Sequence, residues 1–354
     1  MIRLQPRTET PAALRLAVPV AAAFASLLLA AIPLAAAGAP VGRAYAAMIQ
    51  GALGSPFALA EVLTRATPLI LTGLAAAVAF RARLYNIGAE GQLYLGALAA
   101  VAVGAGAVAG PPALMIPLVL GAGALAGAAA MLGPALARVW LGADEVVTTL
   151  LLNFVVLLLV QMMIEGPMKD PMSLGWPQSE PLLDAAALPK LVERTRLHAG
   201  LLVALAAAAL VQVVLSRTVA GFSIRAVGAS APAARFAGLP VRATLLGVGA
   251  LSGALAGLAG AGEVAGVKGF LAADLSPGYG YAGIVVAMLA GLSPLGTVAA
   301  ALFVAAVFVG ADSMSRAVGV SSYIANLIVA MALIAVLVAG LLTRYRLLFA
   351  RRPA

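Results

Sequence analysis

Residues 81–100 read RARLYNIGAEGQLYLGALAA, a polar break in an otherwise apolar region. Asn86, Glu90 and Gln92 stand among glycines in this break, whereas 63% of the whole chain is hydrophobic. Lipid offers backbone amides no hydrogen-bond partners, so a broken polar stretch at membrane depth persists only inside protein or beside a water-filled path. This stretch is therefore the first place where we expect a functional role.

The composition on either side of the break is that of a helical membrane protein. The chain has 354 residues, of which 10% are charged, and its mean hydropathy is +1.08. A soluble domain carries about 25% charged residues. Several apolar runs reach the roughly 20 residues that cross a bilayer. We predict an all-α, polytopic helical membrane protein with about ten transmembrane segments in one domain over residues 1–354.

The expected spans follow the apolar runs. The N-terminal run from Leu16 to Ala37 resembles a signal peptide but exceeds the roughly 7–15 residues of a signal core, so we interpret it as a retained span. The run at 280–291 is too short to cross alone, so eight full spans and a re-entrant hairpin are an alternative. The candidate spans are 14–38, 58–80, 87–108, 112–136, 145–164, 198–215, 243–263, 280–291, 294–311 and 324–342.

Charges in the loops predict an orientation. With the N-terminus inside, ten spans place the loop 216–242, which carries four arginines and no acidic residue, on the cytoplasmic side. The loop 165–197, with four basic and five acidic residues, falls outside. This pattern follows the positive-inside rule. We therefore expect a multi-pass protein of the bacterial inner (plasma) membrane, whose tails, 1–13 and 343–354, are cytoplasmic.

Two interrupted apolar segments suggest an internal repeat. The span 58–80 leads into the break NIGAEGQ, and the span 243–263 leads into a second break followed by the short run 280–291. By the orientation above, these two units run in opposite directions. Interrupted segments at matching positions of two halves are typical of an inverted repeat with broken helices around a central pathway.

Composition also excludes several functions. The net charge of +9 comes from arginines in short loops, so membrane orientation explains it and we expect no nucleic-acid partner. Cysteine is absent and His198 is the single histidine, which leaves no disulfide, no thiolate nucleophile and no multi-histidine metal site. There is no G-x-S-x-G motif, so an intramembrane enzyme has no support. An ion- or proton-coupled secondary transporter, with Glu90 as its ion site, stays an alternative.

The polar residues of the first break allow two interpretations. Glu90 would lie in the first turn of a helix beginning near Ile87, where a carboxylate satisfies free amides and opposes the dipole. Alternatively the turn lies inside the protein, where a charged residue costs about 2.5–3.5 kcal/mol to insert and marks a pathway. On the second interpretation Asn86, Glu90 and Gln92 line a substrate pathway.

Further polar candidates stand at other helix ends. Asn153 either faces a neighbouring helix or lines the pathway, where its amide can donate to and accept from a base or a ribose hydroxyl. Tyr279 and Tyr281 in the second break either stack on a planar base or anchor at the membrane interface. Asp144 is expected to cap the helix that follows it. His198 is expected to be a solvated residue at a span's mouth.

Residues 221–238, GFSIRAVGASAPAARFAG, lie in the basic loop. Their alanine-rich middle, 229–237, predicts a short helix between two turns, capped by Ser230 because Pro232 follows within the first turn. Such a surface helix is either an anchor to anionic lipid or a docking element for a cytoplasmic partner.

Four motifs in one order resemble a known family. RARLYNIGAEGQLYLGALAA and GFSIRAVGASAPAARFAG resemble the F-N-I-G-x-E-G-Q stretch and the cytoplasmic coupling loop of ATP-binding-cassette (ABC) importer permeases of the nucleoside and simple-sugar branch. DEVVTTLLLNFVVLLL and SPGYGYAGIVVAML match the same permeases in the same order. The resemblance covers about residues 60–340. The chain departs from the family at Ser230, where Asn is commoner, and at Gly291–Leu292, where a polar pair is common.

The resemblance implies a function and a set of partners. Such permeases pair with a second, identical or related permease subunit, engage two cytoplasmic ABC ATPases and receive solute from an extracytoplasmic solute-binding lipoprotein. Nucleosides are the expected solutes here, and sugars or other small solutes are the alternative. The chain has no G-x-x-x-x-G-K-[ST] motif, so ATP would be bound by the partner ATPases and the chain itself would need no cofactor. Residues 221–240 would be the coupling helix, with these ATPase-coupling residues: Arg225, Gly228, Ala233, Ala234, Arg235 and Gly238.

Overall fold

The computed structural model describes residues 2–6, 28–29 and 31–349. Its helices confirm the predicted all-α class, and from residue 56 onwards each predicted span coincides with a helix. The chain forms two compact units, residues 60–303 and residues 1–59 with 304–354. The predicted first span, 14–38, lies largely outside the described residues. Among the described residues, six helices are long and apolar enough to cross a membrane.

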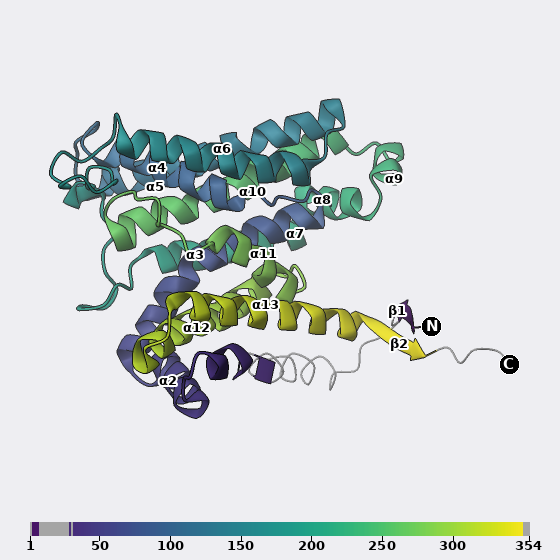
Figure 1. Ribbon diagram of the computed structural model, residues 1–354. Helices are drawn as coiled ribbons and strands as arrows, with labels where there is room; N and C mark the ends of the chain where they lie inside the picture. The colour runs from purple at the N-terminus through teal and green to yellow at the C-terminus, as the bar shows by residue number, and fades with distance from the viewer. Residues whose placement is uncertain (1, 7–27, 30, 350–354) are drawn as a thin grey trace. The chain divides into compact units, whose positions relative to one another are not determined.

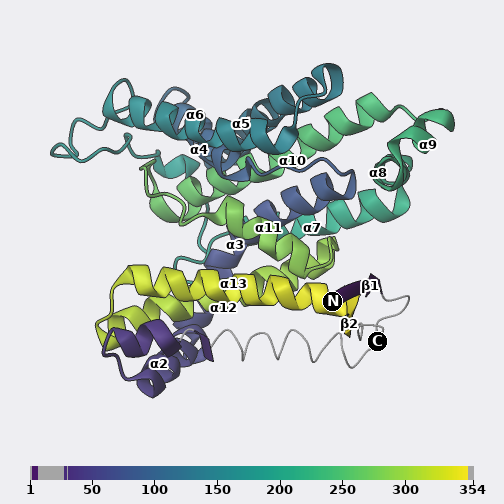
Figure 2. The same ribbon diagram turned by 45° about the vertical axis from the view of Figure 1, so that its right-hand side comes forward.

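The larger unit, 60–303, holds most of the helices (Figure 1). Within it α4, α5, α6 and α10 form one layer and α3, α7 and α11 a second, with α8 and α9 at one end, as both views show (Figure 2). The helices are α3 Pro56–Arg81, α4 Ala89–Gly104, α5 Pro112–Leu136, α6 Glu145–Glu165, α7 Gly200–Arg217, α8 Val219–Ala229, α9 Ala231–Phe236, α10 Val241–Glu263 and α11 Tyr279–Leu289. Single π-helical turns extend α5 to Leu141 and α10 to Lys268, and a 3₁₀ turn spans Asp184–Ala186.

Close packing of α10 against α5 and α4 depends on glycine. Two glycines of α10 form a packing face: a Cβ on Gly253 would strike the Gly127 carbonyl of α5, and one on Gly257 would strike that of Gly123. On the neighbouring face, a Cβ on Gly260 would strike the Leu93 carbonyl of α4. Small residues let helix backbones approach this closely in membranes, where apolar burial gives no net attraction between helices.

Two helices in this unit are too short to span a bilayer alone. At 1.5 Å per residue, α4 with 16 residues and α11 with 11 residues reach roughly 24 Å and 16 Å, less than the ~30 Å hydrocarbon core. The short length predicted for the run 280–291 is confirmed. α3 leads into α4 through the irregular segment 82–88, and α10 leads into α11 through 269–278. The symmetry of these two broken pairs stays a prediction.

The long loop between α6 and α7 lies at the end of this unit opposite α8 and α9 (Figure 1). It is fastened to the helices by polar contacts: Arg196 forms an ion pair with Glu61 of α3, with Nε 2.9 Å from Oε1. The Leu182 amide donates to the Gly269 carbonyl, and the Ser179 amide donates to the Leu271 carbonyl. The loop therefore folds over the chain that follows α10.

The smaller unit combines α2 Val41–Leu53, the second half of α12 Pro294–Val318, and α13 Ser322–Arg344. α2 approaches α12 closely, because a Cβ on Gly51 would strike Ser313 and one on Gly310 would approach the Met48 carbonyl. Strands β1 Ile2–Pro6 and β2 Tyr345–Phe349 pair antiparallel, with Ile2 opposite Phe349. The sequence did not predict this ribbon, which joins the two tails.

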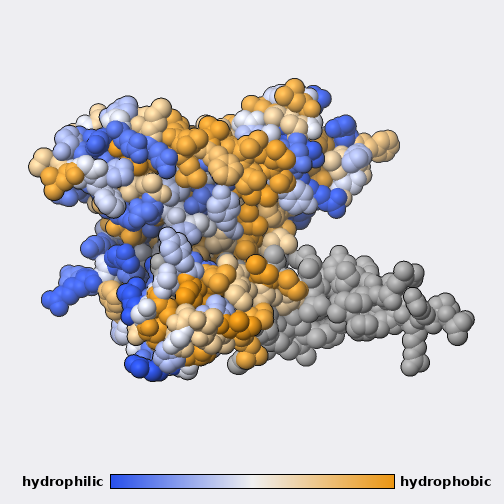
Figure 3. Space-filling view, viewed as in Figure 1, coloured by the Kyte–Doolittle hydropathy of each residue, from blue (hydrophilic) through white to orange (hydrophobic). Residues whose placement is uncertain are grey.

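The surface of the larger unit that Figure 3 shows is apolar around the middle of its helices and polar toward their ends. On the face seen in Figure 3, hydrophobic residues cover the middle of the helices, and hydrophilic residues gather toward both ends. Large side chains exposed along α6, including Leu151, Phe154 and Leu158, contribute to the apolar surface. This pattern fits a helix bundle with a lipid-facing belt.

Candidate functional site

The first break is a closed network of hydrogen bonds. The Asn86 Nδ2 group donates to Gln92 Oε1 at 2.8 Å and to Ser252 Oγ of α10 at 2.9 Å, and Gln92 Nε2 donates back to Asn86 Oδ1. Ser252 in turn donates to the Ala75 carbonyl of α3. Asn86 and Gln92 are completely buried in the chain. The break therefore ties α3, α4 and α10 together, since buried polar groups must be paired.

Asn153 of α6 continues this network. Its Oδ1 accepts from the Gly91 amide at 2.8 Å, which is one of the free amides in the first turn of α4. Its Nδ2 donates to the Ile87 carbonyl and to the Tyr281 hydroxyl, at 3.1 and 3.2 Å. Asn153 is completely buried and thus faces a neighbouring helix, as one of the two interpretations of this residue predicted.

Glu90 joins the two breaks. Its Oε2 accepts from the Gly280 amide at 2.6 Å, so its carboxylate sits at the N-terminus of α11 while Glu90 itself lies in the first turn of α4. A Cβ on Gly280 would strike the Glu90 backbone, so the two helix ends touch. Both N-termini carry partial positive charge, which one carboxylate between them offsets. This contact joins positions 190 residues apart in sequence.

The second break is held by side chains of α3 and α4. The Tyr94 hydroxyl donates to the Ala273 carbonyl at 2.7 Å and accepts from the Ser276 amide at 3.1 Å. Ser276 Oγ accepts from the Tyr279 amide, and Thr72 of α3 donates to the Tyr279 carbonyl. The break is therefore a fixed joint with satisfied polar groups.

The structure brings most predicted pathway residues into one polar joint. Asn86, Glu90, Gln92, Asn153 and Tyr281 form it, and Tyr279 adjoins it through its backbone. Tyr281 alone of the six is exposed, at 41%, while the others are at most 4% exposed. Chemically, the exposed phenol of Tyr281 is the part of the joint able to stack on a planar ring, while the buried Asn153 amide holds that phenol in place.

The loop 216–242 folds into a compact helical knob at one end of the larger unit. Thr218 caps α8, and the predicted cap by Ser230 is confirmed, because its Oγ accepts from the Ala233 amide of α9. Val227, Ala234 and Val241 form a small apolar cluster that joins α8, α9 and the start of α10. A force on α9 therefore reaches α10 through direct packing.

The predicted coupling residues divide by orientation. Ala233, Arg235 and Gly238 are exposed on α9 and its C-terminal turn, whereas Ala234 is buried in the cluster. Gly228 packs so tightly that a Cβ would strike the Arg81 carbonyl of α3. Arg225 turns back toward the Leu215 carbonyl of α7.

Sequence reasoning missed Phe236. This side chain ends α9 and is 97% exposed, next to Arg235. An aromatic residue directly after an arginine in a basic loop was the signal that could have identified it, although Phe222 of the same loop is exposed as well. Aromatic residues and arginine are the anchors most enriched at protein–protein contacts.

The prediction for His198 was wrong. His198 is 1% exposed, because its ring packs against the backbone of Gly200 and Gly266. Its Nδ1 accepts from the Gly200 amide at 3.1 Å, and its Nε2 has no hydrogen-bond partner among the described residues. Burial lowers the pKa of His198 to about 4. The loop folding over the end of α10 was not visible in the sequence. The capping role of Asp144 is confirmed by its bond from the Val146 amide.

A polytopic bundle with broken helices and a helical knob at one end is the architecture of a membrane permease. Residues 58–339 match the family described as the permease component of branched-chain amino acid transport systems. A glucose ABC transporter permease of Haloferax volcanii is 38% identical over 98% of this chain and 93% of its own. A guanosine ABC transporter permease of Bacillus subtilis is 34% identical over 89% of this chain and 91% of its own.

A nucleoside ABC transporter permease of Lactococcus lactis is 32% identical over 84% of each chain. No solved structure gives a significant match. The chain belongs to the ABC transporter permeases of the nucleoside and simple-sugar importer branch. Its role is accordingly transport rather than catalysis.

Proposed function

We propose that this chain is the membrane-spanning subunit of an ATP-driven importer of nucleosides, and that its knob 216–242 is the element moved by a partner ATPase. The single observation that carries the coupling role is Phe236, which projects at 97% exposure from α9. The knob behind Phe236 is packed onto α10, so a partner holding Phe236 also moves α10. The chain then supplies the pathway and the ATPase supplies the energy.

The proposed assembly has a second permease subunit, cytoplasmic ABC ATPases and an extracytoplasmic solute-binding lipoprotein. The family and the relatives support ATPase and binding-protein partners. We propose that the ATPase contacts α9 through Phe236 and Arg235, while Gly228 and Ala234 hold the knob's shape. The loop 165–197, at the opposite end of the larger unit, is the proposed side for the lipoprotein.

The proposed orientation places 216–242 and both tails, 1–13 and 343–354, in the cytoplasm of a cell whose plasma membrane the chain spans. Arginine without acidic residues in 216–242 supports this side. The β1–β2 ribbon supports a common side for the two tails, because it joins residues 2–6 to residues 345–349. Tails that pair must lie on one side of the membrane, which requires an even number of crossings.

Nucleosides are the proposed solutes. Two relatives are named as permeases for guanosine or for nucleosides, and the exposed Tyr281 ring, held by Asn153, offers a surface on which a planar base can stack. Asn86, Glu90 and Gln92 then brace the joint at which Tyr279 and Tyr281 meet the pathway. The glucose permease relative makes a simple sugar the second candidate.

Uptake by the complete complex in proteoliposomes tests the coupling. We expect uptake to require ATP and the binding lipoprotein, and we expect Phe236→Ala to lower ATP-coupled uptake about tenfold or more, as loss of an aromatic anchor does. Phe154→Ala is the matched control, since Phe154 is 58% exposed on α6, far along the chain from the knob. Full uptake by Phe236→Ala would contradict the coupling role.

The same vesicles separate the solutes and the transport mechanism. Radiolabelled uridine, guanosine and glucose are offered in turn, and we expect the nucleosides to be taken up and to compete with one another. Uptake of glucose alone would reject nucleosides and leave the permease role intact. Uptake by this chain without ATPases, driven by a proton gradient, would reject the ATP-driven role.

A further inference from the structure

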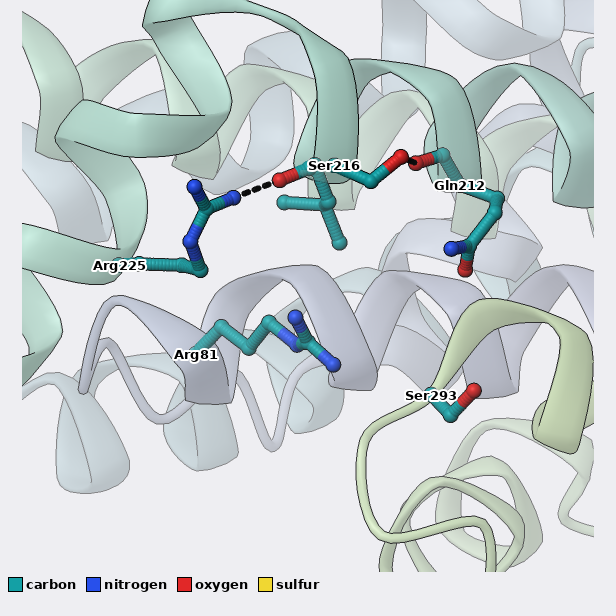
Figure 4. Close-up of a pocket in the computed structure, with 6 residues that line it drawn as sticks. Arg81, Gln212, Ser216, Arg225 and Ser293 are labelled. Atoms are coloured by element: carbon teal, nitrogen blue, oxygen red, sulfur yellow. Dashed lines mark hydrogen bonds between the residues drawn. The ribbon is translucent and has the colours of Figure 1, made fainter.

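Two arginines face one pocket at the end of the larger unit that carries the knob. The pocket has a volume of about 350 Å³ and lies between the last turns of α3 and α7, the middle of α8 and the turn before α12. In Figure 4 the Arg225 side chain points toward α7 beside Ser216, and the Arg81 side chain lies along α3 below it. Its lining consists of Arg81, Gln212, Leu215, Ser216, Arg225 and Ser293.

The charges of this pocket are not balanced within the chain. Arg81 Nε donates to the Leu292 carbonyl at 3.0 Å, and Arg225 donates to the Leu215 carbonyl. Neither guanidinium forms an ion pair with a carboxylate in the described part of the chain, and no acidic side chain lines the pocket. The two positive charges are close enough to repel each other.

The backbone contacts fix the two guanidinium groups while leaving donors free. A guanidinium has five N–H donors, and one of them in each arginine bonds a carbonyl. The remaining donors share the pocket with the polar side chains of Gln212, Ser216 and Ser293, although the Ser216 hydroxyl already donates to the Gln212 carbonyl. A group that fits such a set carries negative charge and several acceptor oxygens.

We infer that this pocket binds a phosphoryl anion, held between Arg81 and Arg225. Arginine matches phosphate because its planar fork donates two parallel hydrogen bonds to two phosphate oxygens. Binding also removes the repulsion between the two guanidinium groups. The bound anion would join α3 and α7 to α8, and thereby stiffen the base of the knob. The site does not depend on which solute is transported.

A phosphoryl group can reach this pocket from two sources. The pocket lies at helix ends, and basic pockets between transmembrane helices bind the headgroups of anionic lipids. Free inorganic phosphate presents the same oxygens from the aqueous side. A lipid headgroup and free phosphate present the same phosphoryl oxygens to the site, so binding measurements with each probe must distinguish between them.

The test titrates the purified complex in detergent with three probes, measured by native mass spectrometry and by thermal unfolding. The probes are short-chain phosphatidylglycerol, short-chain phosphatidylcholine of equal chain length, and inorganic phosphate. We expect Arg81→Gln and Arg225→Gln each to weaken binding about tenfold. Gln212→Leu, which leaves both arginines and their backbone bonds in place, should weaken binding about threefold.

Arg217→Gln is the matched control. Arg217 ends α7 close to the pocket and carries the same charge, yet it does not line the pocket. Saturable, variant-sensitive binding of phosphatidylglycerol over phosphatidylcholine assigns the site to a lipid headgroup. Variant-sensitive binding of inorganic phosphate alone assigns it to a free anion. Absence of binding by every probe, or equal weakening by Arg217→Gln, would overturn the proposal.

Discussion

At the scale of single residues, buried amides decide how the broken helices are held. Asn153 satisfies the Gly91 amide and the Ile87 carbonyl, both of which are backbone groups at an interrupted helix start. Such groups have no other partner inside a lipid-embedded bundle. A single side chain on α6 thus substitutes for the missing turn of helix at the start of α4.

We expect Asn153→Leu to destabilise the chain by about 1–3 kcal/mol, because it leaves two buried backbone groups unpaired. Thermal unfolding in detergent measures this change. The matched variant Tyr281→Phe removes only the hydroxyl that Asn153 also contacts, and it should leave stability nearly unchanged while weakening nucleoside uptake. An Asn153→Leu protein with wild-type stability would show that this amide is not structural.

His198 gives a dependence of stability on pH with a defined sign. Burial lowers its pKa from 6.5 to about 4, so the folded state holds the neutral ring. The resulting stability is fully present above pH 6.5 and is lost as pH falls toward 4, because the unfolded chain then binds the proton more tightly.

We expect the unfolding temperature to fall as the pH is lowered from about 7 to 5.5, and His198→Leu to flatten this dependence. Because His198 is the single histidine, no other imidazole titrates in this window. Unfolding followed by intrinsic fluorescence at several pH values provides the measurement. An equally steep slope in the His198→Leu protein would assign the dependence to other groups.

At the scale of elements, glycine contacts set the distances between helices. Gly260 of α10 touches the Leu93 carbonyl of α4, whereas a Cβ on Gly262, two residues further along, would meet nothing within 4 Å. A glycine-to-alanine substitution therefore has different consequences at these two positions. Only the substitution at Gly260 forces α4 and α10 apart.

We expect Gly260→Ala to destabilise the chain by about 1–3 kcal/mol through overpacking. Gly262→Ala should be neutral or stabilising by up to about 1 kcal/mol, since alanine favours a helix. Thermal unfolding of the two variants in the same detergent compares their stabilities directly. Equal destabilisation by both would mean that helix propensity, not close approach, governs these sites.

The sequence predicted the elements well and their meeting points poorly. Apolar length located α3, α10 and the other helices, because the length of an apolar run is a local signal. The contact between Glu90 and the Gly280 amide joins residues far apart in the chain, so no local pattern predicts it. The contact of Arg225 with the Leu215 carbonyl likewise depends on where α7 ends.

At the scale of the whole molecule, the loop charges and the family motifs gave most of the predictions. Loop charges predicted an orientation, and four motifs in order predicted the permease family that the comparisons confirm. The sequence could not predict the pairing of the tails, since β1 and β2 are short and lie at opposite ends of the chain. The exposure of Phe236 was also hidden, because it depends on how α9 packs against Val241.

Site-specific crosslinking tests most directly whether a cytoplasmic ATPase drives this chain through α9. A photo-crosslinking phenylalanine analogue replaces Phe236 in the assembled complex, and the same analogue at Phe154 serves as the control. We expect position 236 to crosslink to the ATPase subunit and position 154 to lipid. A crosslink from position 236 to the solute-binding lipoprotein, or to no subunit of an ATP-hydrolysing complex, would contradict both the orientation and the coupling role.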